Sequence, residues 1–286
     1  MTRRLAFLAA ACLVLGPALA QPMTPPTDEQ RLAAALAGLK PQRPGVVDAF
    51  VIVAALDSDP VFGREAREAG RVLASRFGAQ GRTIVLAEDE GEARADAAGT
   101  PTHLASAVAG TALRMDRGED VLVLYLTSHG TPRAGINFKH PVHGRGIVTP
   151  AQLAAMLDGT GLQNRLVVIQ ACFSGQFVRP LATPRTVVAT AASSMKPSFG
   201  CSPGNDWTFF GHALINQAMR RPDSFVRQFR RAMVTILGWE KQLGIEPSNP
   251  QISIGKDTAA WLAALDGHAA AVPVAPVGRP PSELAQ

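Results

Sequence analysis

The sequence has few of the features that indicate a nucleic-acid or membrane partner. It contains one tyrosine and three tryptophans among 286 residues, which are too few to form the aromatic platforms on which bases stack. After the first twenty residues, no apolar run approaches the length of about 20 residues that a helix needs to cross a bilayer. We therefore expect no nucleic-acid partner and no integral membrane segment in the mature protein.

The first twenty residues have the pattern of an export signal. Two arginines are followed by the apolar stretch 5–15, and Ala18-Leu19-Ala20 has the small-x-small form of a cleavage site. We expect residues 1–20 to be a signal peptide, which makes the mature protein periplasmic or secreted. A lipoprotein signal ending at Cys12 and a twin-arginine signal are alternatives, but the residues around each fit poorly.

Without the signal peptide, the chain carries a small positive charge and two cysteines. Lysine plus arginine falls from 28 to 26 against 23 acidic residues, so the net charge falls from +5 to about +3. This excess is too small to indicate binding to a polyanion. Cys172 and Cys201 could form a disulfide in an oxidising compartment. The alternative is that Cys201 is a buried thiol and Cys172 is reactive.

Composition divides the mature chain into three parts. Residues 21–47 contain five prolines and form a leader with one short helix over 28–39, which Asp28 caps. Residues 48–266 have the apolar content of a folded domain. Residues 267–286 are rich in alanine, proline and valine, which is typical of a disordered tail. We therefore expect a single folded domain between the leader and the tail.

Apolar runs typical of strands alternate with segments of helical spacing across that domain. Continuous runs such as 49–56 and 120–127 predict strands that are buried on both faces. The alternation of strands with helices predicts an α/β fold, a three-layer αβα sandwich around a mostly parallel sheet. The predicted strands are 49–56, 82–87, 120–127, 165–170 and 186–191, with a hairpin strand at 134–138. The predicted helices are 61–77, 100–115, 150–157, 207–219, 224–243 and 258–265, and Thr100 and Thr149 are the expected caps of the second and third.

A histidine and a cysteine follow two of the predicted strands. Ser128-His129-Gly130 comes after the third strand, and Ala171-Cys172 comes after the fourth. Ligands of open α/β sheets bind at the carboxyl ends of the strands, so we expect His129 and Cys172 to meet there. A cysteine is mostly protonated at neutral pH, and a neighbouring imidazole can take its proton. The N–H groups of Gly130 and Cys172 are candidate donors to the oxyanion of an acyl-transfer reaction.

The other polar residues predict neither a metal nor a cofactor. His140 and His143 flank Pro141, which excludes a helix there, and no cluster with a third ligand is evident. We interpret this segment as a polar loop, and His103, in a predicted helix, as structural or exposed. Residues 57–60 after the first strand lack the glycines of a phosphate-binding loop. We therefore expect no metal and no cofactor.

The segments VLVLYLTSHG (121–130) and VVIQACFSG (167–175) resemble the legumain family of cysteine peptidases, family C13. That family has His-Gly after one strand and a Glu-Ala-Cys-x-Ser-Gly type of motif after the next. The likeness extends over roughly residues 48–255. The resemblance implies a caspase-like fold, with His129 and Cys172 as the catalytic dyad and Gly130 as an oxyanion donor.

The same resemblance implies a pocket for the residue before the cleaved bond. Gln170, two residues before the nucleophile, is expected to lie beside this pocket, and Arg64 and Ser198 are expected to contribute to it. Gln170 stands where the family has glutamate, and His212 stands where the family has an acidic pocket residue. These departures change the charge of the pocket, so cleavage after asparagine does not follow from the resemblance.

Together these residues predict an exported cysteine endopeptidase. It would hydrolyse bonds of a peptide or protein substrate through a thioester acyl-enzyme. There are two alternatives. A transpeptidase or transamidase would use the same dyad and resolve the thioester with an amine instead of water. A catalytically silent binding module would keep the scaffold without turnover.

Overall fold

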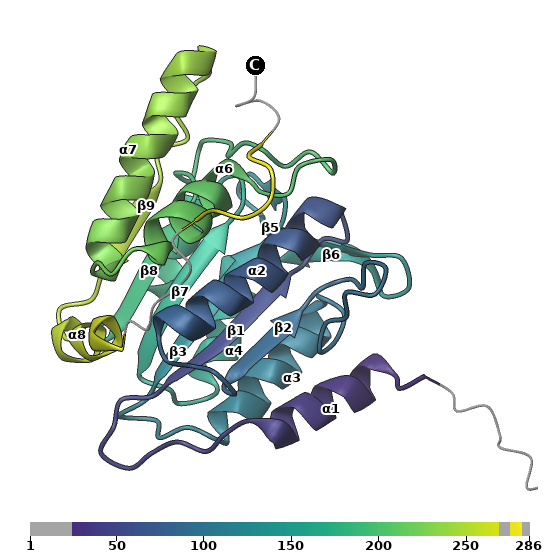
Figure 1. Cartoon of the computed structure of the whole chain (residues 1–286), viewed down its shortest axis with the longest axis vertical. Coiled ribbons are helices and arrows are strands. Elements are labelled where there is room, and N and C mark those ends of the chain that lie inside the picture. Colours follow the sequence, from purple (N-terminus) through teal and green to yellow (C-terminus); the bar gives the residue numbers. More distant parts are fainter. Residues whose placement is uncertain (1–24, 269–274, 282–286) are drawn as a thin grey trace, which may run out of the picture.

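A mostly parallel sheet forms the centre of the computed structural model, which describes residues 25–268 and 275–281 (Figure 1). All neighbouring strand pairs in this sheet are parallel except the last, which is antiparallel. The predicted signal peptide lies outside the described residues. The strands lie in the order β2 (Thr83–Leu86), β1 (Ala49–Ala55), β3 (Val121–Thr127), β7 (Asn164–Gln170), β8 (Thr186–Thr190) and β9 (Gln251–Ile254).

Helices cover both faces of the sheet (Figure 1). The predicted α/β fold, a three-layer αβα sandwich, is therefore confirmed. No helix in the described part of the chain is long and apolar enough to cross a membrane. One face carries α2 (Pro60–Arg76), α6 (Phe209–Gly211), α7 (Phe225–Leu243) and α8 (Ala259–Gly267). The other face carries α1 (Asp28–Gly38), α3 (Pro101–Ala112), α4 (Pro150–Asp158) and α5 (Val178–Leu181).

The central strands are apolar along their whole length because both of their faces are buried. In β1, Val51 and Val53 belong to the core on the α2 side, whereas Phe50 and Ile52 belong to the core on the α3 side. Successive side chains of a strand point to opposite faces. Burial on both sides therefore explains why the sequence shows continuous apolar runs here instead of an alternating pattern.

Local sequence signals set where several helices begin. Thr100 and Thr149 cap α3 and α4 as predicted, and a proline follows each of them at the first helical position. The leader helix α1 differs from its prediction. Its cap is Thr27, which forms a capping box with Gln30. Asp28 lies in the first turn of the helix, where its negative charge interacts favourably with the helix dipole.

Three segments differ from the predicted secondary structure. The hairpin of β5 (Gly135–His140) and β6 (Gly144–Val148), with β4 (Gly130–Thr131) paired to β5, is longer than the strand predicted at 134–138. The predicted helix 207–219 is broken into α6, a π-helical segment, His212–Gln217, and a 3-10 turn, Ala218–Arg220. The strand β9 was not expected.

The described part of the C-terminal tail packs on the domain, in contrast to the disorder predicted for 267–286. The carbonyl of Val277 accepts hydrogen bonds from Trp207 Nε1 and Asn216 Nδ2, both at 2.9 Å. The amide of Arg279 donates to Asp206 Oδ2 at 2.7 Å. These contacts belong to residues 275–281, and the rest of the tail, 269–274 and 282–286, lies outside the described residues.

Candidate active site

The predicted histidine and cysteine lie at one edge of the sheet, beyond neighbouring strands. β3 and β7 pair in parallel, with Thr127 opposite Gln170. His129 and Cys172 each follow these partners by two residues. The amide of Ser128 donates to the carbonyl of Gln170 at 3.1 Å, which holds the two strand ends together. The register therefore brings the two motifs to the same edge on adjacent strands, as the sequence predicts.

Gly130 sits directly against the backbone of Cys172. A Cβ atom on Gly130 would lie 1.9 Å from the carbonyl oxygen of Cys172 and 3.2 Å from its nitrogen. Only glycine allows the two strand ends to approach this closely. The predicted oxyanion donors, the amides of Gly130 and Cys172, belong to these adjoining segments.

The sulfur of Cys172 is held by the segment that follows β8. Its Sγ accepts a hydrogen bond from the Ser198 amide at 3.2 Å and lies 3.4 Å from the Ser198 carbonyl. Burial raises the pKa of the Cys172 thiol, and the bond from the Ser198 amide opposes that rise. Cys172 is a free thiol, so it forms no disulfide with Cys201. At neutral pH we therefore expect a protonated sulfur at rest.

The imidazole of His129 is held by Asp59, which the sequence did not single out. His129 Nε2 lies 3.3 Å from Asp59 Oδ2, and Asp59 Oδ1 binds Lys139 Nζ at 2.7 Å. Partial burial raises the pKa of Asp59, but the bonds from Lys139 and His129 outweigh it and the net pKa is lowered. Asp59 is therefore an ionised partner of the imidazole. Its place just after β1, at the edge where strand ends gather, is the signal that could have identified it.

The resting side chains of His129 and Cys172 have separate partners. In the described part of the chain, the hydrogen bonds of His129 lead to Asp59, and those of the Cys172 sulfur lead to Ser198. The His129 ring also packs edge-on against Phe62, with centroids 4.9 Å apart. Catalytic hydrogen bonds often form only when substrate is bound. We therefore expect the imidazole and the sulfur to meet when a substrate is bound.

The comparison with protein families covers both strand-end motifs. The model of the peptidase C13 family matches residues 95–260, which is more than half of the chain. The chain belongs to the peptidase C13 family. This confirms the resemblance that the two motifs indicated.

Solved structures and curated proteins were also compared with the chain. The crystal structure of caspase-1 from Spodoptera frugiperda is similar at 13% identity and a TM-score of 0.48, over 76% of this chain and 94% of that chain. The structure of pro-sf-caspase-1 is similar at 14% identity and a TM-score of 0.46, over 72% of this chain and 87% of that chain. No curated protein matches.

Gln170, two residues before Cys172, was expected beside the pocket that the resemblance implies. Gln170 is fully buried, and its Nε2 lies 3.9 Å from Cys201 Sγ. Its Oε1 has no hydrogen-bond partner in the described part of the chain. Ser198 approaches Cys172 through its backbone. Ser198 therefore contacts Cys172 and Gln170 lies against Cys201, and the contact of either residue with substrate stays a prediction.

The guanidinium of Arg64 contacts acidic side chains and a backbone carbonyl of the segment that follows Ser198. Its guanidinium pairs with Glu90 at 2.7 Å and with Asp206 at 3.7 Å, and it donates to the carbonyl of Asn205 at 3.2 Å. These contacts join α2 to the segment that leads from Ser198 towards α6. Arg64 therefore supports this segment, and its role as a pocket residue stays a prediction.

His212 does not fit the pocket role that was predicted for it. Its ring packs near Trp207 and Trp239, and its two nitrogens meet the side-chain amides of Asn216 and Gln217 at 3.0 and 3.1 Å. Burial lowers the pKa of His212 to about 4, so the ring is neutral at physiological pH. Because both nitrogens are bonded within its own helical segment, His212 is a core residue here.

Proposed function

We propose that this chain is an exported cysteine endopeptidase in which Cys172 is the nucleophile and His129 is the general base. Membership of the C13 family supports cysteine peptidase chemistry. The observation that carries the residue assignment is the register of β3 and β7, which brings both residues to one edge. Export is supported by the pattern of residues 1–20, and N-terminal sequencing of the mature protein should begin at Gln21.

The proposed reaction starts from the protonated sulfur of Cys172. His129 takes the proton as sulfur attacks the substrate carbonyl carbon, and the carbonyl electrons move to oxygen. The amides of Gly130 and Cys172 stabilise this oxyanion. The imidazolium then gives its proton to the amine as the C–N bond breaks, which leaves a thioester on sulfur. Water, deprotonated by His129, hydrolyses the thioester and the thiol is restored.

Asp59 has a positioning role in this scheme. A carboxylate bonded to an imidazole fixes the orientation of the ring and stabilises the imidazolium that forms during proton transfer. Asp59 is itself held by Lys139, so each of its two carboxylate oxygens has a partner. Its Oδ2 lies 3.3 Å from His129 Nε2, which is close enough for the charge of Asp59 to stabilise an imidazolium.

We expect Asp59→Asn to lower kcat by roughly 10- to 100-fold, a part of what general acid–base catalysis contributes. Asparagine keeps the shape of aspartate but lacks the charge that stabilises an imidazolium. Since Asp59 is not expected to contact the substrate, KM should change little. Steady-state kinetics with a fluorogenic peptide separate the two constants, and Asp59→Glu should restore part of kcat. A rise in KM at unchanged kcat would argue for a substrate-binding role instead.

Labelling of Cys172 tests the proposed function directly. The rate of alkylation by iodoacetamide should rise with pH towards a midpoint above the ordinary pKa of cysteine, because burial raises the pKa of this thiol and only the thiolate reacts. A peptide-based electrophile should label wild type faster than iodoacetamide does, since peptide binding brings the imidazole to the sulfur. For the same reason, the peptide-based electrophile should label His129→Ala more slowly than wild type.

The same preparation distinguishes the two alternatives. Cleavage of a peptide library in the presence of an added amine should give hydrolysis products; amine adducts would identify a transpeptidase or transamidase. Absence of both cleavage and electrophile labelling at Cys172 would support a silent binding module. An alkylation midpoint well below the ordinary cysteine pKa would contradict the neutral resting thiol.

A further inference from the structure

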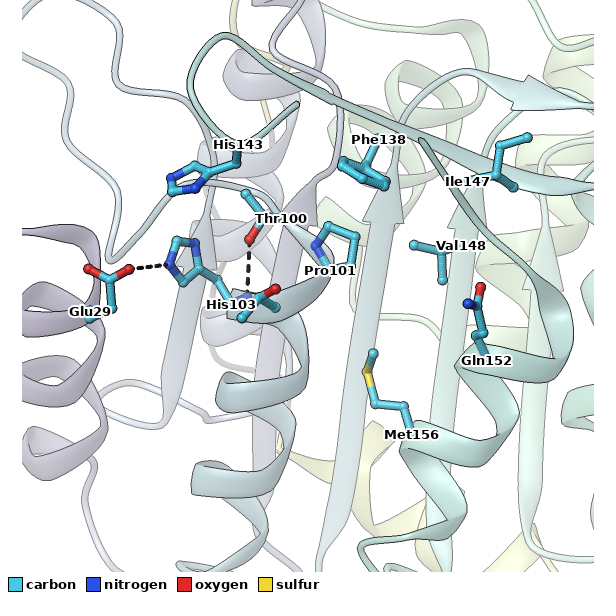
Figure 2. Close-up of a pocket in the computed structure, with 11 residues that line it drawn as sticks. Glu29, Thr100, Pro101, His103, Phe138, His143, Ile147, Val148, Gln152 and Met156 are labelled. Carbon is cyan, nitrogen blue, oxygen red and sulfur yellow. Dashed lines mark hydrogen bonds and ion pairs between the residues drawn. The ribbon is translucent and has the colours of Figure 1, made fainter. Parts of the chain in front are cut away.

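A second cluster of polar side chains lies on the other helical side of the sheet, where three distant parts of the chain meet (Figure 2). His103 is on α3, His143 is in the turn between β5 and β6, and Asp28 and Glu29 begin α1. Figure 2 shows the rings of His103 and His143 beside the carboxylate of Glu29. The ring centroids of the two histidines are 5.3 Å apart. The leader, a helix and a hairpin therefore contribute nitrogen and oxygen ligands to one place.

Backbone contacts fix the tautomer of His103. Its Nδ1 lies 2.9 Å from the carbonyl of Ala98, so Nδ1 carries the proton and donates it. Nε2 is then left with a lone pair, and it faces Glu29 Oε1 at 3.6 Å. Two acceptors face each other across this gap, an arrangement that a cation between them would satisfy. Histidines that bind metals commonly donate their other N–H to a backbone carbonyl in this way.

His143 is positioned by its neighbour His140. Nδ1 of His140 accepts hydrogen bonds from the amides of Val142 and His143 at 3.1 and 3.2 Å. His140 Nε2 therefore carries the proton, and it lies 2.6 Å from Glu88 Oε2. His140 thus shapes the turn and is not itself a ligand. The turn places His143 Nε2 at 3.5 Å from Asp28 Oδ2.

We propose that Asp28, His103 and His143 bind a zinc ion, with Glu29 as the fourth ligand. One ligand atom from each of the first three lies within 4.8 Å of the others. Adjacent ligands on a tetrahedral zinc with bonds of about 2.0 Å lie about 3.3 Å apart. The observed separations of 3.5 Å and 3.6 Å between histidine nitrogen and carboxylate oxygen are close to this value. Glu29 contacts His103 alone among the proposed ligands, so its exposed side chain must also turn towards Asp28 and His143 to complete the set.

The donor set favours zinc over calcium or magnesium. Two imidazole nitrogens suit zinc and its neighbours in the transition series, whereas calcium and magnesium prefer oxygen alone. The two carboxylates balance the charge of a divalent ion, since both histidines bind in the neutral form. Asp28 is directed by Arg31, which pairs with its other oxygen. A cavity of about 430 Å³, lined by Glu29, His103 and His143 together with apolar side chains, gives the ion access from solvent.

The bound ion would clamp the leader helix onto the domain. The leader supplies Asp28 and Glu29, and the other two ligands lie at least 74 residues further along the chain. The hairpin that carries His143 also contacts the candidate active site, because the amide of Asn137 in β5 donates to the carbonyl of His129 at 2.9 Å. The zinc site would therefore stabilise both the docking of α1 and the hairpin beside the catalytic histidine.

Zinc titration of the purified protein after dialysis against EDTA tests the site. We expect saturable binding of one zinc ion per chain by calorimetry and a rise in Tm with zinc concentration, since the ligand binds only the folded state. Cobalt in place of zinc should give the intense visible bands of a tetrahedral ion. His143→Ala and Asp28→Asn should each lose all three responses. Both residues are outside the core, and circular dichroism checks that the variants are folded.

His129→Ala provides the matched control. Asp57, Asp59 and His129 also place ligand atoms within 4.8 Å of one another, but the ammonium of Lys139 already lies 2.7 Å from Asp59 and 3.7 Å from Asp57. We expect His129→Ala to keep zinc binding and the zinc-dependent rise in Tm. If zinc binding were lost in His129→Ala but kept in His143→Ala, the zinc site would be at Asp57, Asp59 and His129 instead, and the proposal would be overturned. No saturable binding by wild type would also overturn it.

Discussion

Replacing Cys172 with alanine should remove the proposed peptide hydrolysis, with kcat/KM reduced by at least about 10⁴-fold, the scale seen when a catalytic nucleophile is deleted. The loss is this large because no other group in the proposed reaction can form the thioester. Cys172→Ser should behave in the same way, since the serine hydroxyl is a much weaker nucleophile beside an imidazole arranged for sulfur. Turnover of the best substrate from a peptide library measures both variants.

The fold should survive these replacements of Cys172. Serine is close to cysteine in volume and can still accept the hydrogen bond from the Ser198 amide, so the free energy of unfolding should change by about 1 kcal/mol or less. Cys201→Ser is the matched control, because it removes the other described cysteine and leaves the sulfur at position 172. We expect it to retain turnover. Activity that persists in Cys172→Ala, or that disappears only with Cys201, would remove Cys172 from the mechanism.

The sequence predicted the parts of the fold that depend on burial. The runs 49–56 and 120–127 are continuous apolar strands because both faces of a central strand are covered, and β1 and β3 lie there. The strand β9 was missed because an edge strand of four partly exposed residues, Gln251–Ile254, has no such run. The π-helical turn at His212–Gln217 contacts residues that are distant in the sequence, such as Val277, and local spacing does not reveal such contacts.

Some residues of the candidate site could be predicted from the sequence, and others could not. His129 and Cys172 were predictable because two buried strands end just before them and parallel strands share an edge. Asp59 was not predicted, because the role of its carboxylate depends on contacts with Lys139 and His129, which are at least 70 residues away in the sequence. His212 was expected in the pocket, and only its packing against Trp207 and Trp239 shows that its ring is buried. The cluster of His103 and His143 was missed because its carboxylate ligands come from the leader.

Gly130→Ala should damage both stability and catalysis. The added methyl carbon would lie 1.9 Å from the carbonyl oxygen of Cys172, and backbone atoms cannot turn away as a side chain would. One strand end must move, which we expect to lower the free energy of unfolding by about 1–3 kcal/mol, as overpacking does. A shift of about 1 Å between nucleophile and base can cost about 100-fold in rate, so kcat/KM should fall by at least that factor.

Gly238→Ala is the control for adding a methyl group. Gly238 lies in α7, and a Cβ there would meet no atom within 4 Å. This variant should therefore gain about 0.5–1 kcal/mol of stability from helix propensity and keep its activity. Urea unfolding and turnover per folded molecule, measured side by side, separate the two effects of Gly130→Ala. If that variant were as active as wild type, the close approach of the two strand ends could not matter for the proposed reaction, and the proposed dyad would lose its structural basis.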